Sequence, residues 1–179
     1  MEKCEGVERP FSRHHPFTKE GTLMQKQLLF TNLDSFANQE FSRAVRKGAW
    51  RSIVSWFTKQ CNNLLPFDRD SLKDVMRGQR HLGLQTVPLD QIVGSEGRFR
   101  EFDRAFFPRQ THTMDRWLSL AKAQVRSVNL QPVDLVKVGE SYFVTDGNHR
   151  ISVARALGQQ FIEAQVVEVM TAVPFPRPC

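Results

Sequence analysis

The chain has 179 residues and a mass of 20.7 kDa, which suits one medium domain or a small domain with an extension. Hydrophobic residues make up 40% and charged residues 25%, so we expect a packed core and not wholesale disorder. Lysine and arginine number 25 against 19 acidic residues, and the resulting net charge of +6 favours a phosphate-bearing partner.

Several classes of protein are excluded at this stage. No apolar run of about 18 residues occurs, so we expect neither a transmembrane helix nor a membrane partner. The first residues lack the apolar core of a secretory signal. The three cysteines, Cys4, Cys61 and Cys179, are too scattered for a disulfide framework or a Cys-x-x-Cys zinc site. These features favour a cytoplasmic protein.

The first 21 residues are charged, contain two prolines and show no hydrophobic period. We expect residues 1–21 to form a flexible tail, in which His14 and His15 are either metal ligands or, as is more common for adjacent histidines in a tail, solvated.

A helical pattern begins at Leu33 and continues to about Lys59. Apolar residues recur there every three or four positions: Leu33, Phe36, Ala37, Phe41, Ala44, Val45, Ala49, Ile53, Trp56 and Phe57. We expect this stripe to pack on another helix or on the later domain. The basic residues between Arg43 and Arg51 lie largely off the stripe, where they are either solvated or in contact with the DNA backbone.

A second, shorter helix is predicted from about Arg69 to Arg77, capped by Asp68 and ended by Gly78. Residues 79–83 then read as a linker. Together these features predict an all-helical N-terminal unit over residues 22–82.

The second half of the chain alternates between strand and helix patterns. The predicted elements are a strand at Leu84–Leu89, a helix at Met114–Val125, a hairpin of Pro132–Val138 with Tyr142–Thr145, a helix at Ile151–Leu157 and a strand at Phe161–Val169. We expect a small α/β domain over residues 84–170, followed by a proline-rich tail over 171–179. The whole chain is therefore predicted to be α+β.

The segment with the clearest chemical signal joins the second hairpin strand to the next helix, through Asp-Gly-Asn-His-Arg. Gly147 allows a sharp turn, and the first amides of the helix form an anion site together with its dipole. Arg150 suits a bidentate phosphate contact, and His149 can donate to phosphate or move a proton. Asp146 suits a metal ion, a hydroxyl proton or the orientation of His149.

A purely structural interpretation of this turn stays open. Asp146 and Asn148 are of types that cap helices and bond to nearby backbone, and the following histidine and arginine could be incidental. The same holds for the loop at residues 94–104. Its Arg98 and Arg100 alternate along an extended chain and could face one phosphate, or could be solvated.

The stretch from about Val87 to Val169 resembles the ParB/sulfiredoxin superfamily, the ParB-like nuclease domains. The resemblance rests on Val-Pro-Leu-Asp-Gln-Ile, the arginine-bearing loop, Pro-Val-Asp-Leu-Val and above all Val-Thr-Asp-Gly-Asn-His-Arg-Ile-Ser-Val-Ala-Arg-Ala-Leu-Gly. It covers a little under half the chain and is nearest to the Asp-Gly-x-His-Arg form seen in free serine kinases.

The resemblance implies a small α/β fold whose turn binds the phosphates of a nucleotide. By this correspondence Gly147, Asn148, His149, Arg150, Arg98 and Arg100 contact phosphate, and Asp146 and His149 take part in catalysis. The cofactor implied is a nucleoside triphosphate or diphosphate with Mg²⁺. The base of the kinase-like members is a separate upstream acid, for which Glu96, Glu101 and Asp103 are candidates, with Glu101 preferred.

The sequence departs from each subgroup of the superfamily. Asn148 stands where sulfiredoxins have their catalytic cysteine, so sulfiredoxin activity is not expected. Asn148-His149 replaces the Glu-Arg of chromosome-partitioning proteins, and no secure carboxylate cluster supports a nuclease.

Two functions are therefore predicted as alternatives. The first is a nucleotide- or phosphate-binding protein whose further activity would be phosphotransfer. The second is a non-enzymatic DNA-binding regulator that uses the basic N-terminal helix. Oligomerisation stays open.

Overall fold

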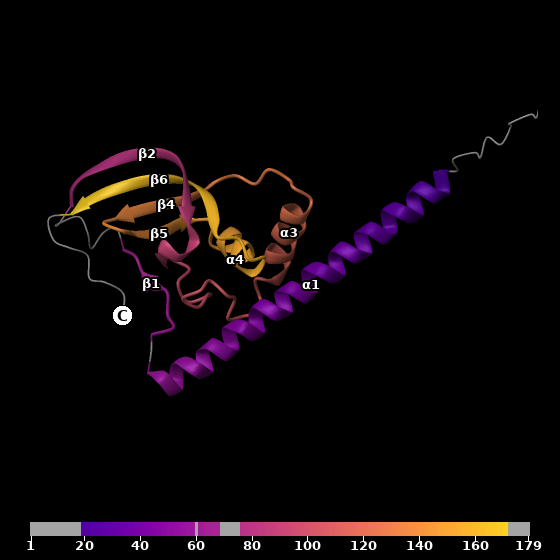
Figure 1. Ribbon diagram of the computed structural model, residues 1–179, viewed down its shortest axis with the longest axis horizontal. Coiled ribbons are helices and arrows are strands. Elements are labelled where there is room, and N and C mark those ends of the chain that lie inside the picture. The colour runs from indigo at the N-terminus through magenta and orange to yellow at the C-terminus, as the bar shows by residue number, and fades with distance from the viewer. Residues whose placement is uncertain (1–18, 60, 69–75, 172–179) are drawn as a thin grey trace, which may run out of the picture. The chain divides into compact units, whose positions relative to one another are not determined.

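The computed structural model describes residues 19–59, 61–68 and 76–171 (Figure 1). Side chains are described from Thr31 onward. Its contacts divide the chain into two compact units, Met1–Asn32 and Leu33–Cys179. The predicted tail at residues 1–21 lies outside the description up to residue 18, and residues 19–21 are helical. The predicted proline-rich tail also lies outside it, apart from Thr171.

Helix α1 spans Lys19–Thr58 and so begins well before the predicted start at Leu33. Its buried side chains include Ala37, Phe41 and Ala44, which pack in one cluster with Trp117. The last part of the predicted stripe does not pack, since Trp56 is 76% exposed and Phe57 72%. Helical spacing correctly predicts the helix, but it does not say where the partner surface ends.

The other elements follow in the order β1 (Leu65–Pro66), β2 (Met76–Pro88), a 3₁₀ turn (Leu89–Gln91), β3 (Ile92–Ser95), α3 (Met114–Val125), β4 (Val133–Val138), β5 (Ser141–Asp146), α4 (Asn148–Ala156) and β6 (Phe161–Thr171). The six strands form one mixed sheet in the order β1-β3-β5-β4-β6-β2 (Figure 1). Strands β4 and β5 are an antiparallel hairpin, while β3 pairs with β5, and β4 with β6, in parallel. This mixture of helices and sheet confirms the α+β class.

The predicted all-helical unit over residues 22–82 is wrong beyond α1. Of the short helix predicted at 69–77, residues 69–75 lie outside the described residues, but Met76 and Arg77 belong to β2. The predicted linker at 79–83 is also part of β2, which pairs with β6 from Met76 to Pro88. This strand is held by its backbone ladder, and most of its side chains are at least partly exposed, so no alternating hydrophobic pattern marks it.

The predictions for the second half agree more closely with the structure. Helix α3 has the predicted bounds, and the hairpin and final strand occupy their predicted places. Helix α4 starts three residues earlier than predicted, at Asn148. The sequence analysis also missed β3, because Gly94 and Ser95 interrupt its short apolar run.

The core lies on both faces of the sheet. On one face, Leu135 and Val144 pack in one cluster with Ile151 of α4. On the other, Phe67 stacks on Phe143 with ring centroids 4.7 Å apart. No helix in the described part of the chain is long and apolar enough to cross a membrane.

Helix α4 is fixed in place by α3 as well as by the sheet. The buried Trp117 of α3 donates a hydrogen bond of 3.0 Å to Ser152 Oγ of α4. Buried polar contacts of this kind orient helices, because an unpaired donor in the core costs about 1–3 kcal/mol. The start of α4 therefore has a defined position at the end of β5.

Candidate functional site

The turn between β5 and α4 holds Asp146 to Arg150 in a tightly constrained backbone. Gly147 caps the helix with a φ of 105°, and a Cβ there would lie 2.5 Å from Cγ1 of Val133. Both the conformation and the space therefore demand glycine. The first amides of α4 have no acceptor within the helix and lie at the positive end of its dipole, the usual geometry of an anion site.

Asn148 and His149 follow at the first two positions of the helix, and each side chain is only 5% exposed. Asn148 Oδ1 and His149 Nε2 are buried without a hydrogen-bond partner among the described residues. Buried polar atoms are almost always paired, and each unpaired one costs about 1–3 kcal/mol. Both residues also line the cleft described below, so their unpaired atoms are candidates for contact with a ligand.

The environment of His149 keeps its imidazole neutral. Its ring meets Phe102 edge-on, with centroids 5.3 Å apart. Burial, together with the nearby positive charge of Arg116, lowers the pKa of His149 to about 4. A neutral imidazole at pH 7 has one donor nitrogen and one acceptor nitrogen. His149 is therefore suited to donate a hydrogen bond to an anion, and not to supply a permanent charge.

Arg150 is engaged in the structure of the turn itself. Its guanidinium donates to the carbonyl oxygens of Gln131 and Pro132 at 2.5 and 2.7 Å and to Asp146 Oδ2 at 2.5 Å. Its side chain is 15% exposed, whereas that of Asp146 is 63% exposed. Arg150 thus ties the start of α4 to the segment before β4, in addition to lining the hollow in front of the helix.

A cleft of about 450 Å³ opens in front of this turn. All five residues from Asp146 to Arg150 line it, as do Glu96 and Arg98 from the loop after β3 and Arg116 from α3. The remaining lining residues are Leu120, Asn129, Leu130, Gln131 and Thr145. The fold therefore brings three arginines, a buried neutral histidine and two carboxylates to one cavity.

The predicted arginine loop contributes only in part. Arg98 lines the cleft and also donates to Glu101 Oε1 at 3.0 Å, as an exposed ion pair. Arg100 does not line the cleft. Its guanidinium instead lies 5.5 Å from the ring centre of Phe99. Glu101, the preferred candidate base, is likewise held by Arg98 outside the lining, whereas Glu96 is part of it.

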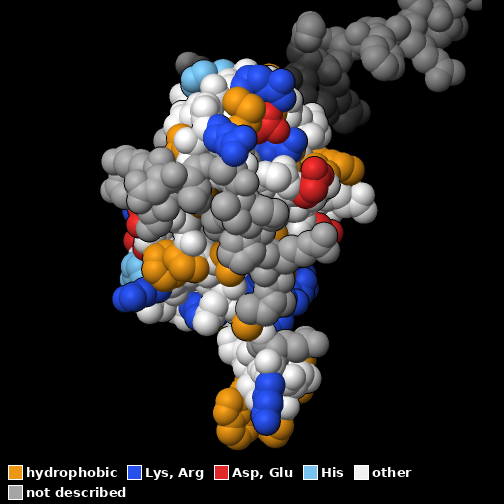
Figure 2. Space-filling model, turned by 90° about the vertical axis from the view of Figure 1, so that its left-hand side faces the viewer, with side chains coloured by type: hydrophobic (Ala, Val, Ile, Leu, Met, Phe, Trp, Pro, Cys, Tyr) orange, Lys and Arg blue, Asp and Glu red, His pale blue; other side chains and the backbone are white. Residues whose placement is uncertain are grey.

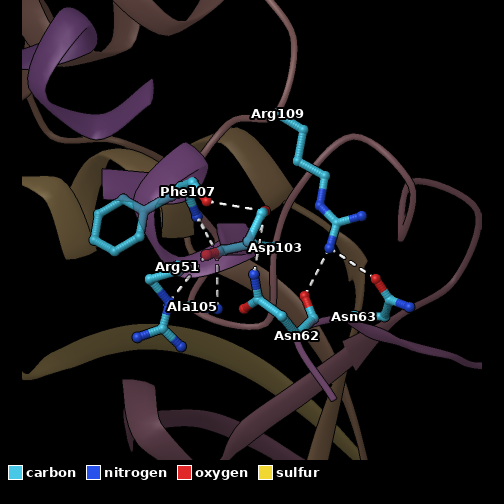
Figure 3. A network of polar contacts seen from close by, with 9 residues as sticks. Arg51, Asn62, Asn63, Asp103, Ala105, Phe107 and Arg109 are labelled. Carbon is cyan, nitrogen blue, oxygen red and sulfur yellow. Dashed lines mark hydrogen bonds and ion pairs between the residues drawn. The ribbon is translucent and has the colours of Figure 1, made fainter. Parts of the chain in front are cut away.

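Asp103, a further candidate base, has a structural role instead (Figure 3). Its side chain is fully buried, and its carboxylate accepts from the amides of Ala105 and Phe107 at 2.9 and 2.8 Å. It also accepts from Arg51 Nε of α1 at 3.0 Å. Burial raises the pKa of Asp103, while these donors oppose the rise. Asp103 thus folds the loop after β3 onto helix α1.

Arg116 is a residue of the cleft that was not predicted from the sequence; it lies in the first turn of α3. Only the polar side of the amphipathic helix marks it in the sequence, and that side carries other charges as well. The placement of Arg116 depends on the contact between α3 and α4 through Trp117.

Metal binding in the cleft would depend on the ligand. The described residues contain no group of three histidine, cysteine, aspartate or glutamate side chains that would hold a metal alone. Glu96 and Asp146 are the two carboxylates of the cleft. Mg²⁺ in proteins commonly takes one or two carboxylates plus the phosphates of a substrate, so this pair fits a magnesium–nucleotide complex.

No known family model matches the chain, and no curated protein matches it in sequence. Among solved structures, the chain is similar to sulfiredoxin from Arabidopsis thaliana, with 20% identity over 49% of this chain and 86% of that one. The TM-score of this match is 0.37. The α+β assignment rests on the strand order and pairing of the chain itself.

Proposed function

We propose that the cleft at the N-terminus of α4 binds the phosphate groups of a nucleotide. The observation that carries this proposal is that two polar atoms in the first turn of α4, Asn148 Oδ1 and His149 Nε2, are buried and have no hydrogen-bond partner among the described residues. A phosphate oxygen accepts from the neutral imidazole and from the first helix amides. A hydroxyl or amino group of the same ligand donates to the asparagine oxygen.

The charges around the cleft support an anionic ligand. Arg98 and Arg116 line it from two different elements, and Arg150 lines it beside the helix start. Because the carboxylate of Asp146 already neutralises part of the charge of Arg150, Arg98 and Arg116 are the arginines that we expect to contact phosphate most strongly. One of the two carboxylates, Glu96 or Asp146, would hold a Mg²⁺ ion together with those phosphates, which leaves the other free to act as a base.

The space beyond the turn supports a nucleotide in preference to free phosphate. A second hollow of about 510 Å³ shares Asn129, Leu130, Gln131 and Arg150 with the cleft. Its other walls include the apolar side chains of Phe161 and Ile162. A ligand with phosphates at α4 therefore has room for a sugar and a base alongside.

Phosphoryl transfer is the reaction that such a site would serve. Arg98, Arg116 and the helix amides would stabilise the charge on the transferred group, and Glu96 or Asp146 would accept the proton of the attacking hydroxyl. The sulfiredoxin reaction is not proposed, since Asn148 supplies no thiolate.

Calorimetric titration of nucleoside di- and triphosphates, with and without Mg²⁺, tests the binding proposal. We expect the double variant Arg98→Gln/Arg116→Gln to lose about a hundred-fold or more in affinity, since charged contacts to phosphate contribute about 1.5–3 kcal/mol each. Arg80→Gln is the matched control, because Arg80 pairs with Glu168 at the far edge of the sheet and does not line the cleft. If no nucleotide binds at millimolar concentration, or if the control variant loses as much affinity, the proposal is wrong.

Product analysis of the same mixtures tests the reaction separately. Release or transfer of the terminal phosphate by the wild type, lost in Glu96→Gln or Asp146→Asn with nucleotide still bound, would support phosphotransfer. Binding without turnover toward any hydroxyl acceptor would leave a nucleotide-binding protein and refute the enzymatic part.

A further inference from the structure

A further hollow, lined by basic and aromatic side chains, lies on helix α1 and shares no lining residue with the α4 cleft. It has a volume of about 600 Å³ and is lined by Arg43, Arg46, Lys47, Trp50, Arg51 and Phe107. Five of these residues come from three turns of α1, and Phe107 comes from the loop that Asp103 fixes against the helix. We call this set the α1 hollow.

The charge at the α1 hollow is strongly one-sided. From Phe41 to Phe67 the chain has five basic residues and no acidic one. Two lining arginines have acidic partners, since Arg43 pairs with Glu40 and Arg51 with Asp103. Arg46 and Lys47 are exposed and add further positive charge at the same place. The α1 hollow is therefore electrostatically complementary to a polyanion.

Aromatic rings are interleaved with these cations. Trp50 is 67% exposed and lies between the basic residues Lys47 and Arg51 on the helix. The ring of Phe107 is half-buried and lies 5.7 Å from Lys47 Nζ, a cation–π contact. An exposed tryptophan has a flat apolar face in contact with water, and covering it with another ring system is favourable.

We propose that the α1 hollow binds single-stranded nucleic acid, with one base stacked on Trp50 and the flanking phosphates held by Arg46 and Lys47. Single strands alternate phosphate and accessible base, which matches a surface that alternates cation and ring. A duplex presents phosphates alone to a helix lying on its backbone and would leave Trp50 uncovered. The basic segment between Arg43 and Arg51 has thus both of the features that single-strand recognition needs.

The apolar surface continues past the α1 hollow toward the end of the helix. Ile53, Trp56 and Phe57 are 50%, 76% and 72% exposed, and hydrophobic side chains stand beside a basic one at the lower end of Figure 2, where α1 ends. These residues do not line the α1 hollow, and the Trp56 ring instead packs edge-on against Phe57 at 4.9 Å. Trp56 is therefore a natural control for Trp50, since it is a tryptophan of similar exposure on the same helix.

Fluorescence anisotropy with a labelled single-stranded oligonucleotide of mixed sequence tests the proposal on the full chain. We expect Trp50→Ala to weaken binding about ten-fold and Trp56→Ala to change it less than about two-fold, because stacking contributes only where a base is bound. In the double variant Arg46→Gln/Lys47→Gln, the negative slope of log affinity against log salt should become shallower by about 1.4, because two phosphate contacts are lost. Arg98→Gln/Arg116→Gln should bind the oligonucleotide as the wild type does, which separates this site from the α4 cleft.

Five results would each overturn the proposal. The first is the absence of single-strand binding at low salt. The second is an equal loss in Trp50→Ala and Trp56→Ala, which would point to a general apolar surface. The third is tighter, Trp50-independent binding of the matching duplex. The fourth is a preference for vesicles of anionic phospholipid. The fifth is a change of oligomeric state in Trp50→Ala, measured by light scattering.

Discussion

Asp103 and the pair Asn148 and His149 are buried polar residues that lie near each other, and they differ in whether their polar atoms have hydrogen-bond partners. Asp103 is fully buried, and its carboxylate accepts three hydrogen bonds, from two amides and Arg51. Asn148 and His149 are buried almost as deeply, yet each has an atom with no partner among the described residues. Asp103 lies in the loop after β3 and the other two residues lie next to it, and both places contain residue types that commonly act in catalysis.

The difference separates a structural role from a binding role. A satisfied buried carboxylate stabilises the fold and has little capacity left for a ligand. Unsatisfied atoms reduce stability, and a protein that retains them next to a cleft usually does so for function. Asp103 and His149 should therefore respond to substitution in opposite ways, which the following experiments measure.

The largest effect is expected from Asp103→Ala. The substitution leaves the buried amides of Ala105 and Phe107, and the guanidinium of Arg51, without their acceptor. We expect the free energy of unfolding to fall by about 3–5 kcal/mol, measured by urea denaturation. Asp103→Asn keeps one acceptor oxygen for the two amides but sets its NH₂ group against the donor Nε of Arg51, so it should lose less than Asp103→Ala, about 1–3 kcal/mol. If Asp103→Ala is as stable as the wild type, the structural role assigned to Asp103 is incorrect.

A smaller loss of folding stability is expected when the pH is lowered, and it arises from His149. The pKa of this residue is about 4 in the folded chain, against an ordinary value of 6.5. The unfolded chain takes up the proton first, so the stability associated with neutral His149 is fully present above pH 6.5 and is lost as the pH falls toward 4. The loss over this range is on the order of 3 kcal/mol.

Denaturation curves of the wild type and His149→Gln between pH 7 and pH 4.5 isolate this contribution. As the pH falls, the wild type should lose this amount of stability relative to His149→Gln, because glutamine takes up no proton. Parallel curves would contradict the pKa assigned to His149. Asp103 has a raised pKa and acts in the opposite direction, but it is present in both proteins and cancels in the comparison.

The smallest effect on stability is expected from Arg98→Gln. Its ion pair with Glu101 is exposed, with the arginine side chain 48% accessible, so the free energy of unfolding should change by less than about 0.5 kcal/mol. The shift in melting temperature that a bound nucleotide produces should nevertheless shrink in this variant. A large loss of stability with an unchanged nucleotide response would place Arg98 with Asp103, as a structural residue.

Local patterns in the sequence predict much of the fold, because the helices and inner strands carry their own periodicity. Helix α3 and the β4–β5 hairpin have clear 3.6- and 2-residue patterns, and the structure confirms them. Strand β2 has no such pattern, since it pairs with the backbone of β6 along its length and only a few of its side chains, such as that of Val87, are buried. Its glycines then resemble helix stops and linkers, which explains the wrong helical unit.

The part of the candidate site that is contiguous in the chain was predicted from a local pattern, whereas Arg98 and Glu96 were named through the resemblance of their loop. The run from Asp146 to Arg150 is a single turn, so its residues come together in any fold that joins the strand to the helix. Arg116 and Glu96 depend on how α3 and the loop after β3 pack against α4, which no local pattern specifies. The same dependence explains why Asp103 resembles a base in the sequence and turns out to be buried beneath Arg51.

The long strand β2 also bears on how this protein avoids aggregation. It ends the described sheet, with β6 as its one described neighbour, and an edge of 13 residues is a template for intermolecular pairing. Its pairing with β6 shifts register twice, the second time at Gly83, which has a φ of 74°. Arg77 is exposed and adds positive charge to the strand, while the charge of Arg80 is paired with Glu168 of β6. The irregular register and the exposed Arg77 make this edge a poor match for an identical edge, so copies of this chain are discouraged from joining sheet to sheet.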